Sequence, residues 1–270
     1  MHVAPYDRQT GEWTGVPGMA TEERTFSQED YDFDALYAGR ARFEGSDPDA
    51  NFIPWDIGEP QPVIVELEQA GGFRGKVLDV GCGLGENAIL LAGNGHEVTG
   101  VDGSPSAIEQ AGRRASEQGV RVRFLVADAT ELRDIGTGFD TVLDSGLYHC
   151  LNGEQRSAYT AALHRVCRPG AVLHLFCFAE SVPSGTPIAE EALVSTDDLH
   201  ANLDRHWRIE DIADTVFATG FTRELLAKMQ QTGTAAGGTE TAGAPPLDAL
   251  RVDERGRVLT PMHHVRARRR

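Results

Sequence analysis

The sequence is poor in basic residues compared with acidic ones. Its 270 residues hold 25 Lys and Arg against 41 Asp and Glu, which gives a formal net charge of −16. A protein that binds nucleic acid by neutralising phosphates normally carries a basic face, so we expect no nucleic-acid partner. One basic cluster stands at the C-terminus, where we expect a solvated and disordered tail. Its members are Arg266, Arg268, Arg269 and Arg270.

Long apolar runs and closely spaced cysteines are also missing. Stretches such as residues 88–92 fall far short of the roughly 20 apolar residues that a membrane span needs. Residues 1–11 contain no basic region followed by an apolar run, so we expect no secretory signal, no membrane partner and a cytoplasmic protein. No two cysteines have C-x-x-C spacing, and we expect reduced thiols. The cysteines are Cys82, Cys150, Cys167 and Cys177.

What the sequence does contain is a regular alternation of short apolar runs and helical patterns between residues 76 and 178. Strands and helices at such close spacing predict an α/β fold, in which helices cover both faces of a parallel sheet. The helix expected at 104–118 begins with a Ser cap and a proline at its first position. The expected strands are 77–80, 97–101, 120–126, 139–143 and 171–178, and the other expected helices are 86–92 and 154–167.

The two ends of the chain have a different composition. Residues 1–30 are polar and irregular, and we expect a flexible arm there. Aromatic residues within 31–43 predict a short helix that closes over a site, so 31–60 is interpreted as the lid of a single domain over 31–270. Gly, Ala and Thr dominate 232–246, which is typical of a mobile loop. The remaining expected elements are helices at 60–71 and 195–203 and strands at 207–219 and 257–268, the last at a sheet edge.

The most informative stretch follows the first expected strand and reads Asp79-Val80-Gly81-Cys82-Gly83-Leu84-Gly85. Glycines at alternate positions allow a tight turn and let a ligand approach the backbone closely. A dinucleotide fingerprint would read G-x-G-x-x-G, whereas the spacing here is G-x-G-x-G. The carboxylate of Asp79 would repel a pyrophosphate and suits a ligand with a cationic amine. The alternative role for Asp79 is to cap the turn.

Two more acids follow the next expected strands. Asp102 ends the second strand, where an acid accepts hydrogen bonds from ribose hydroxyls. Asp128 follows the third strand, where an acid either accepts from the exocyclic amine of adenine or caps a helix. Open α/β folds bind ligands at the carboxyl ends of their strands, so we expect the three acids to line one site.

Together these residues resemble the cofactor signature of the class I S-adenosylmethionine-dependent methyltransferases. Residues 139–144 resemble the fourth-strand motif of that family and residues 168–171 its turn into the fifth strand, so the resemblance covers about 61–178. Residues 54–62 and 144–149 look like the thiopurine, halide and thiol methyltransferase-like branch, which acts on small molecules. The loop at 232–246 resembles nothing in that branch.

The resemblance implies a Rossmann-like, doubly wound, mostly parallel seven-stranded sheet with an antiparallel edge strand and an N-terminal helical lid. It implies S-adenosylmethionine as the cofactor and S-adenosylhomocysteine as its product. Asp79 would hold the amino group, Asp102 the ribose, and Asp128 with Ala129 the adenine. Trp55 would pack over the sulfonium, or else belong to the core. The other implied cofactor-binding residues are Gly81, Gly83, Gly85, Gly103, Asp144 and Ser145.

His149 is the candidate general base, because it follows the fourth expected strand near the expected methyl acceptor and titrates near neutrality. The alternative is a histidine hydrogen-bonded into its loop. Asp144 and Tyr148 compete with His149 for contact with acceptor or cofactor. We expect a structural role for His174 and no metal site, since the adjacent histidines at 263–264 do not fit the common ligand spacings.

The residues and the resemblance together predict an S-adenosylmethionine-dependent methyltransferase that moves a methyl group to O, N or S of a small molecule in specialised metabolism. One alternative is an enzyme of the same fold that binds this cofactor and catalyses a non-methyl reaction, such as a cyclisation or decarboxylation. A second is a nicotinamide-dependent oxidoreductase, which the glycine spacing and Asp79 disfavour. A protein substrate is a weaker alternative.

Overall fold

The computed structural model describes residues 32–41, 52–180, 182, 188, 192–231 and 247–270, together with the backbone of two short strands near the N-terminus. These strands, β1 (Tyr6–Asp7) and β2 (Glu12–Trp13), pair antiparallel inside the stretch for which the sequence predicted no regular element. The rest of the expected arm and the expected loop at 232–246 lie outside the described residues.

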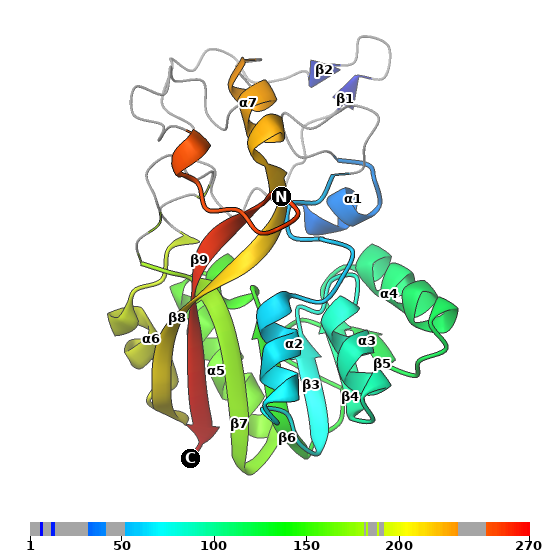
Figure 1. Cartoon of the computed structure of the whole chain (residues 1–270). Coiled ribbons are helices and arrows are strands. Elements are labelled where there is room, and N and C mark those ends of the chain that lie inside the picture. The colour runs from blue at the N-terminus through cyan, green and yellow to red at the C-terminus, as the bar shows by residue number, and fades with distance from the viewer. Residues whose placement is uncertain are drawn as a thin grey trace.

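A seven-stranded sheet forms the centre of the domain, in the order β5-β4-β3-β6-β7-β9-β8 (Figure 1). The strands β3 to β7 run parallel, and β9 runs antiparallel to both of its neighbours. The predicted fold class is therefore confirmed. The strand bounds are β3 Lys76–Val80, β4 Glu97–Asp102, β5 Arg123–Val126, β6 Phe139–Ser145, β7 Cys167–Phe178, β8 Trp207–Thr222 and β9 Arg257–Arg269.

The antiparallel strand β9 occupies a different place from the one predicted. It lies between β7 and β8, so β8 forms the edge of the sheet. The buried side chains of Val265 and Ala267 fit this inner position, because both are fully enclosed. Hydrophobic periodicity identifies a strand but not its neighbours, which explains the wrong placement. The C-terminal arginines were also wrongly expected in a disordered tail, since Arg266 to Arg269 belong to β9.

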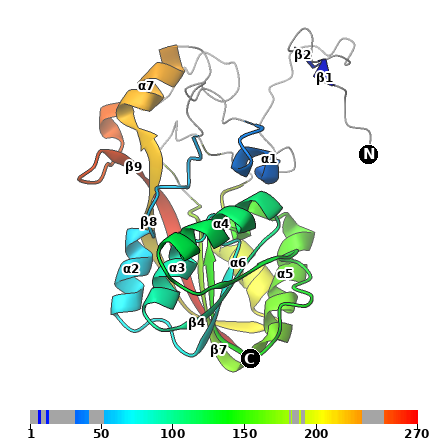
Figure 2. The same ribbon diagram turned by 90° about the vertical axis from the view of Figure 1, so that its right-hand side faces the viewer.

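Helices cover both faces of the sheet (Figure 2). On one face α2 and α3 pack with Leu143 and Phe176, and on the other α5 and α6 pack with Leu173 and Leu175. Ser104 caps α4 by accepting a hydrogen bond from the backbone of Ala107, as predicted. The helices are α1 Phe33–Tyr37, α2 Pro62–Gln69, α3 Glu86–Gly93, α4 Pro105–Glu117, α5 Gly153–Val166, α6 Thr196–Leu203 and α7 Arg223–Gln231, and the short 3-10 turns are η2 Tyr148–Cys150 and η4 Leu247–Ala249.

The N-terminal segment that contains Trp55 is fastened to the last third of the chain. The amide of Gly220 on β8 donates to the carbonyl of Pro54 (2.7 Å). The side chain of Gln61 both donates to and accepts from the backbone of Ala218 (2.9 and 3.0 Å). These contacts hold residues 52–61 at the carboxyl end of the sheet, beside the glycine-rich turn that follows β3.

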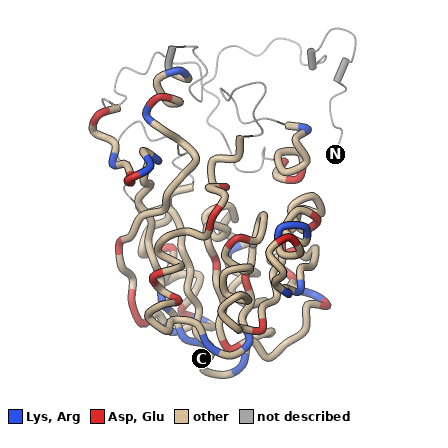
Figure 3. Tube along the Cα trace, turned by 45° about the vertical axis from the view of Figure 1, so that its right-hand side comes forward, with Lys and Arg blue, Asp and Glu red and all other residues tan. Residues whose placement is uncertain are grey.

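Positive charge gathers at the opposite end of the sheet, near the C-terminus (Figure 3). There Arg208, Arg266 and Arg268 surround the carboxylate of Glu210 at 3.1, 3.5 and 2.6 Å. This arrangement neutralises part of the basic cluster at the protein surface. Among the described residues, no helix combines the length and the apolar character that crossing a membrane requires.

Candidate active site

The glycine-rich turn connects β3 to α3 and is tied to β4. The amides of Gly81 and Cys82 donate to the carbonyl of Val101 (2.8 and 3.0 Å). Gly85 has a φ of +87° and caps α3, and a Cβ at this position would meet Phe124 at 2.8 Å and Ala111 at 2.9 Å. Only glycine fits such a backbone in so little space, so the sequence motif is required by the fold. The turn leaves its backbone close to whatever binds at the end of β3.

Asp79 lies just before this turn, with 1% of its surface exposed. Among the described residues, no donor has hydrogen-bond geometry to either carboxylate oxygen, and the backbone of Ala88 makes only a small contribution, which lowers the pKa of the carboxyl. Burial, with smaller contributions from Asp144 and Asp102, raises the pKa of Asp79 to about 8. An unpaired buried carboxylate is costly, and a cationic partner compensates this cost. The arrangement fits the amino group of the expected cofactor.

Asp102 ends β4, and its carboxylate is bound to the turns around it. One oxygen accepts from the amide of Gly83 and the other from the amide of Ser104, both at 2.9 Å. Burial raises the pKa of Asp102 despite these bonds. Each oxygen keeps a second lone pair, which can accept from a ribose hydroxyl. The adjacent Gly103 has open space where a Cβ would stand.

Asp128 follows β5 and is exposed. Its Oδ1 accepts from both the amide and the hydroxyl of Thr130, each at 2.7 Å. This geometry matches the capping interpretation, and it leaves Oδ2 for a ligand such as the adenine amine. Ala129 follows directly and is partly buried.

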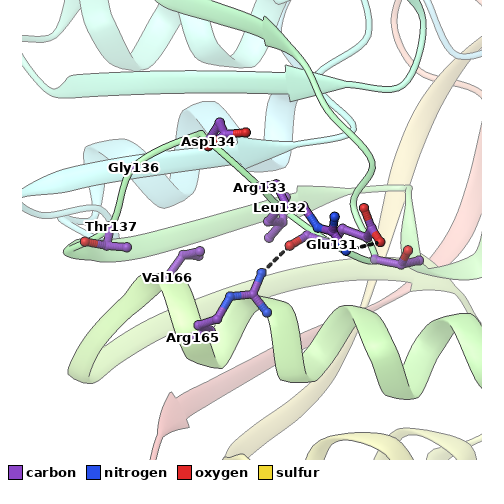
Figure 4. A pocket seen from close by; sticks show the side chains of 9 residues that line it. Glu131, Leu132, Arg133, Asp134, Gly136, Thr137, Arg165 and Val166 are labelled. Atoms are coloured by element: carbon purple, nitrogen blue, oxygen red, sulfur yellow. Dashed lines mark hydrogen bonds and ion pairs between the residues drawn. The ribbon is translucent and has the colours of Figure 1, made fainter.

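A surface hollow of about 680 Å³ lies next to this segment (Figure 4). It is lined by 130–134, 136 and 137 and by Arg165 and Val166 at the end of α5, and none of the predicted site residues lines it. The guanidinium of Arg165 donates to the backbone carbonyl of Glu131. The hollow is therefore separate from the group of acids at the strand ends.

Asp144, near the end of β6, is fully buried but well bonded. Oδ1 accepts from the amides of Leu147 and Tyr148 (2.8 and 3.3 Å), and Oδ2 accepts from the hydroxyl of Tyr159 (2.8 Å). Burial raises its pKa to about 6. These three bonds fix the turn that carries η2, so the geometry favours a positioning role for Asp144. Ser145 follows as the last residue of β6 and is partly exposed.

The side chain of Tyr148 points into the core under α5 and α6. It is fully buried, and its hydroxyl donates to Asp198 (2.9 Å). The guanidinium of Arg156 stacks over the ring at 5.0 Å and pairs with the same Asp198 at 3.0 Å. Tyr148 is therefore engaged inside the protein through both its ring and its hydroxyl.

His149 stacks on Phe178 with ring centroids 3.8 Å apart and 23° between the planes. Its Nδ1 accepts a long bond from the amide of Phe178 (3.4 Å). Burial, together with Arg156, lowers the pKa of His149 to about 3, so the ring is neutral near pH 7. These contacts match the alternative of a histidine hydrogen-bonded into its loop. His149 nevertheless lies near the carboxyl ends of β6 and β7, on the side where the acceptor is expected.

His174 has the expected structural position. Its Nε2 faces the carbonyl of Gly72 (3.1 Å) and its Nδ1 faces Nε2 of His264 (3.0 Å). Among the described residues, no group of three or more His, Cys, Asp or Glu side chains is placed to hold a metal ion.

Trp55 lies in an aromatic cluster above the glycine-rich turn. It packs against Phe33 and Tyr37, with ring centroids 5.6 and 6.3 Å away, and 39% of its surface is exposed. Sequence reasoning placed α1 over the site but singled out neither Tyr37 nor Asp34. Asp34 accepts from the hydroxyl of Ser104 (2.6 Å), a contact between residues 70 positions apart that no local pattern signals.

The sequence of this chain is similar to those of known methyltransferases. The methyltransferase domain family matches residues 77–170, which contain the glycine-rich turn and the acids Asp79, Asp102 and Asp128 at the carboxyl ends of β3, β4 and β5. A 2-heptyl-1-hydroxyquinolin-4(1H)-one methyltransferase of Mycobacteroides abscessus is 34% identical over 174 residues, which are 62% of this chain and 74% of that protein. A probable thiol methyltransferase 2 of Arabidopsis thaliana is 26% identical over 141 residues, 52% of this chain and 62% of that protein.

A solved structure gives a match over more of the chain. It comes from work on the conversion of a disulfide bond into a thioacetal group during echinomycin biosynthesis. The two chains are 34% identical and superpose with a TM-score of 0.68, over 88% of this chain and 91% of the other.

Proposed function

Because this chain belongs to the S-adenosylmethionine-dependent methyltransferases, we propose that it transfers the methyl group of this cofactor to a sulfur atom or a ring-borne hydroxyl of a specialised metabolite. The chain is an enzyme that methylates a small molecule. The choice of acceptor is supported by the hydroxyquinolinone in the name of one relative and by the disulfide conversion studied with the similar structure. These methyltransferase relatives do not support the alternative of a nicotinamide-dependent oxidoreductase.

One observation carries the cofactor assignment. Asp79 is buried at the glycine-rich turn, and within the described ranges its carboxylate oxygens have no partner with hydrogen-bond geometry. An ammonium group would supply both the missing partner and the opposite charge. Bound S-adenosylmethionine carries such a group and supplies a methyl already activated by its sulfonium.

We assign the remaining roles to this chain's residues as follows. Asp102 accepts from the ribose, while Asp128 and the amide of Ala129 read the adenine. Gly81 and Gly83 wrap the methionine half, together with Gly85. Because the methyl is already activated, the protein mainly aligns donor and acceptor and excludes water.

The acceptor side begins at His149. Its pKa is lowered to about 3, so the neutral ring is a weak base that orients a hydroxyl acceptor through a hydrogen bond rather than removing its proton, whereas a thiolate needs no base. Asp144 and Tyr148 act as positioning residues, since both use their polar atoms within the protein. We retain a single domain over 31–270 and a cytoplasmic location as predictions.

The test is calorimetric titration with S-adenosylmethionine and S-adenosylhomocysteine, followed by screening of thiols and hydroxylated heteroaromatics. We expect micromolar binding and a methylated product with one S-adenosylhomocysteine per turnover. The variant Asp102→Ala should bind both ligands at least about tenfold more weakly, because a charged acceptor is lost. Unchanged affinity would refute the ribose role. Turnover without methylated product would favour the non-methyl alternative.

A further inference from the structure

Tyr37 holds its hydroxyl directly against the glycine-rich turn. The ring belongs to α1 and is buried, and its hydroxyl oxygen is 2.9 Å from the place that a Cβ of Gly83 would occupy. Gly83 itself has a φ of +51°. A larger residue at position 83 would displace the phenol. This hydroxyl and the carboxylate of Asp79 therefore flank the same turn.

The phenol has a proton to donate. The indole Nε1 of Trp55 donates to its oxygen at 2.8 Å, and in the described part of the chain no acceptor is found for the phenol's own proton. Burial, and secondarily the charge of Asp102, raises the pKa of Tyr37, so the proton is retained. Accepting one hydrogen bond also makes a hydroxyl a stronger donor.

The arginine side chains near Tyr37 that the structure describes are engaged by carboxylates of the protein. Among the described residues, the guanidinium groups beside α1 and the turn already pair with carboxylates, which leaves neutral donors such as the Tyr37 hydroxyl for a ligand anion. The pairs are Arg40 with Asp34 (2.7 Å), and Arg114 with Asp56 (2.9 Å) and with Glu86.

The position of Tyr37 is fixed independently of any ligand. Asp34, on the same helix, accepts from the hydroxyl of Ser104 and the amide of Ser106 (2.6 and 2.9 Å). The amide of Gln110 donates to the backbone carbonyl of Tyr37 (2.7 Å). Figure 2 shows α1 seated above the start of α4. These bonds hold the helix predicted as a lid against α4 in this structure.

We infer that the hydroxyl of Tyr37 donates a hydrogen bond to the carboxylate of the cofactor's methionine half, while the carboxylate of Asp79 pairs with the ammonium group of the same half. Tyr37 and Asp79 together recognise the zwitterionic amino-acid group of the cofactor, because Tyr37 binds its negative charge and Asp79 binds its positive charge. This inference rests on the proposed function and assigns a residue that the cofactor motif does not contain.

The test compares two ligands that differ only in this head. S-adenosylhomocysteine carries the amino and carboxylate groups, and 5′-methylthioadenosine has the same adenosine and thioether without them. We expect Tyr37→Phe to weaken S-adenosylhomocysteine binding about tenfold or more in calorimetry, because a hydrogen bond to a charged group is lost. Binding of 5′-methylthioadenosine should stay within about twofold of wild type, which also shows that the variant is folded.

Two further variants complete the experiment. Trp55→Phe removes the indole N–H and should weaken S-adenosylhomocysteine binding more than 5′-methylthioadenosine binding, with a smaller difference between the two ligands than Tyr37→Phe gives. Thr160→Val is the matched control, since it deletes a buried hydroxyl that donates to the carbonyl of Asn202 on the other side of the sheet (2.9 Å). This control should leave both affinities unchanged.

The opposing results are distinct. If Tyr37→Phe binds S-adenosylhomocysteine like wild type, or weakens both ligands equally, the role of Tyr37 is overturned while the cofactor assignment stands. If the wild-type protein binds neither S-adenosylhomocysteine nor S-adenosylmethionine, the proposed function itself is overturned.

Discussion

The ends of β3 and β6 each bury an aspartate, and the two aspartates differ in their hydrogen bonding. In the part of the chain that the structure describes, the carboxylate of Asp79 at the end of β3 has no partner with hydrogen-bond geometry, whereas that of Asp144 at the end of β6 has three. The strands are neighbours, and Asp79 aligns with Leu143, so Asp79 and Asp144 project from opposite faces of the sheet. Burial and strand position are shared. We propose that the missing partners distinguish a carboxylate that binds a ligand from one that holds a turn.

The largest expected effect concerns Asp79. Substituting Asp79→Asn removes the charge that we assign to the cofactor's ammonium group, and we expect S-adenosylhomocysteine affinity to fall about 100-fold, or ~2.7 kcal/mol. Calorimetry measures this change. Asp140→Asn is the matched control, because Asp140 lies at the other end of β6 and pairs with Arg168 (3.1 Å). An unaltered affinity in Asp79→Asn would remove the distinction between the two aspartates.

Asp144 should respond in the opposite way. Substituting Asp144→Ala leaves the amide of Leu147 and the hydroxyl of Tyr159 without their acceptor, and we expect the free energy of unfolding to fall by about 3 kcal/mol. Urea denaturation measures this loss. Cofactor affinity of the folded protein should change less than about threefold. A stable variant with strongly impaired binding would instead place Asp144 among the ligand contacts.

The smallest expected effect is an absence of pH dependence from His149. Its pKa is lowered to about 3 by burial, so the ring stays unprotonated as the pH falls from 8 to 5. The rate at saturating acceptor should therefore show no acid limb from this group. The measurement is kcat against pH for wild type and His149→Gln. An inflection near pH 6.5 that disappears in the variant would contradict this expectation.

Much of the cofactor half follows from local sequence. Gly85 and Asp79 lie within one turn, and a strand followed by alternating glycines specifies that turn without distant information. The existence of the strands β3 to β7 was predicted from the same alternation, whereas the order in which they pair was not. The sequence pattern does not show which acids are hydrogen-bonded within the protein. The hydroxyl of Tyr159 donates to Asp144, for example, and this contact depends on how α5 packs on β6.

The acceptor half was predicted less well for the same reason. The direction of the Tyr148 side chain depends on Asp198, which lies 50 residues further along the chain. The place of β9 depends on its pairing with β8, along a register from Trp207–Arg269 to Thr222–Arg257. Such long-range pairings leave no periodic signal within a single segment.

The central claim is that Asp79 awaits a cation, and proton release tests it most directly. A carboxyl with a folded-state pKa of about 8 is mostly protonated at pH 7, and it must lose its proton to pair with an ammonium group. Calorimetry of S-adenosylhomocysteine binding in buffers of different ionisation enthalpy counts the protons released. We expect close to one at pH 7, declining above pH 8, and none for 5′-methylthioadenosine or for Asp79→Asn. Equal proton release for the two ligands, or for wild type and Asp79→Asn, would contradict the account.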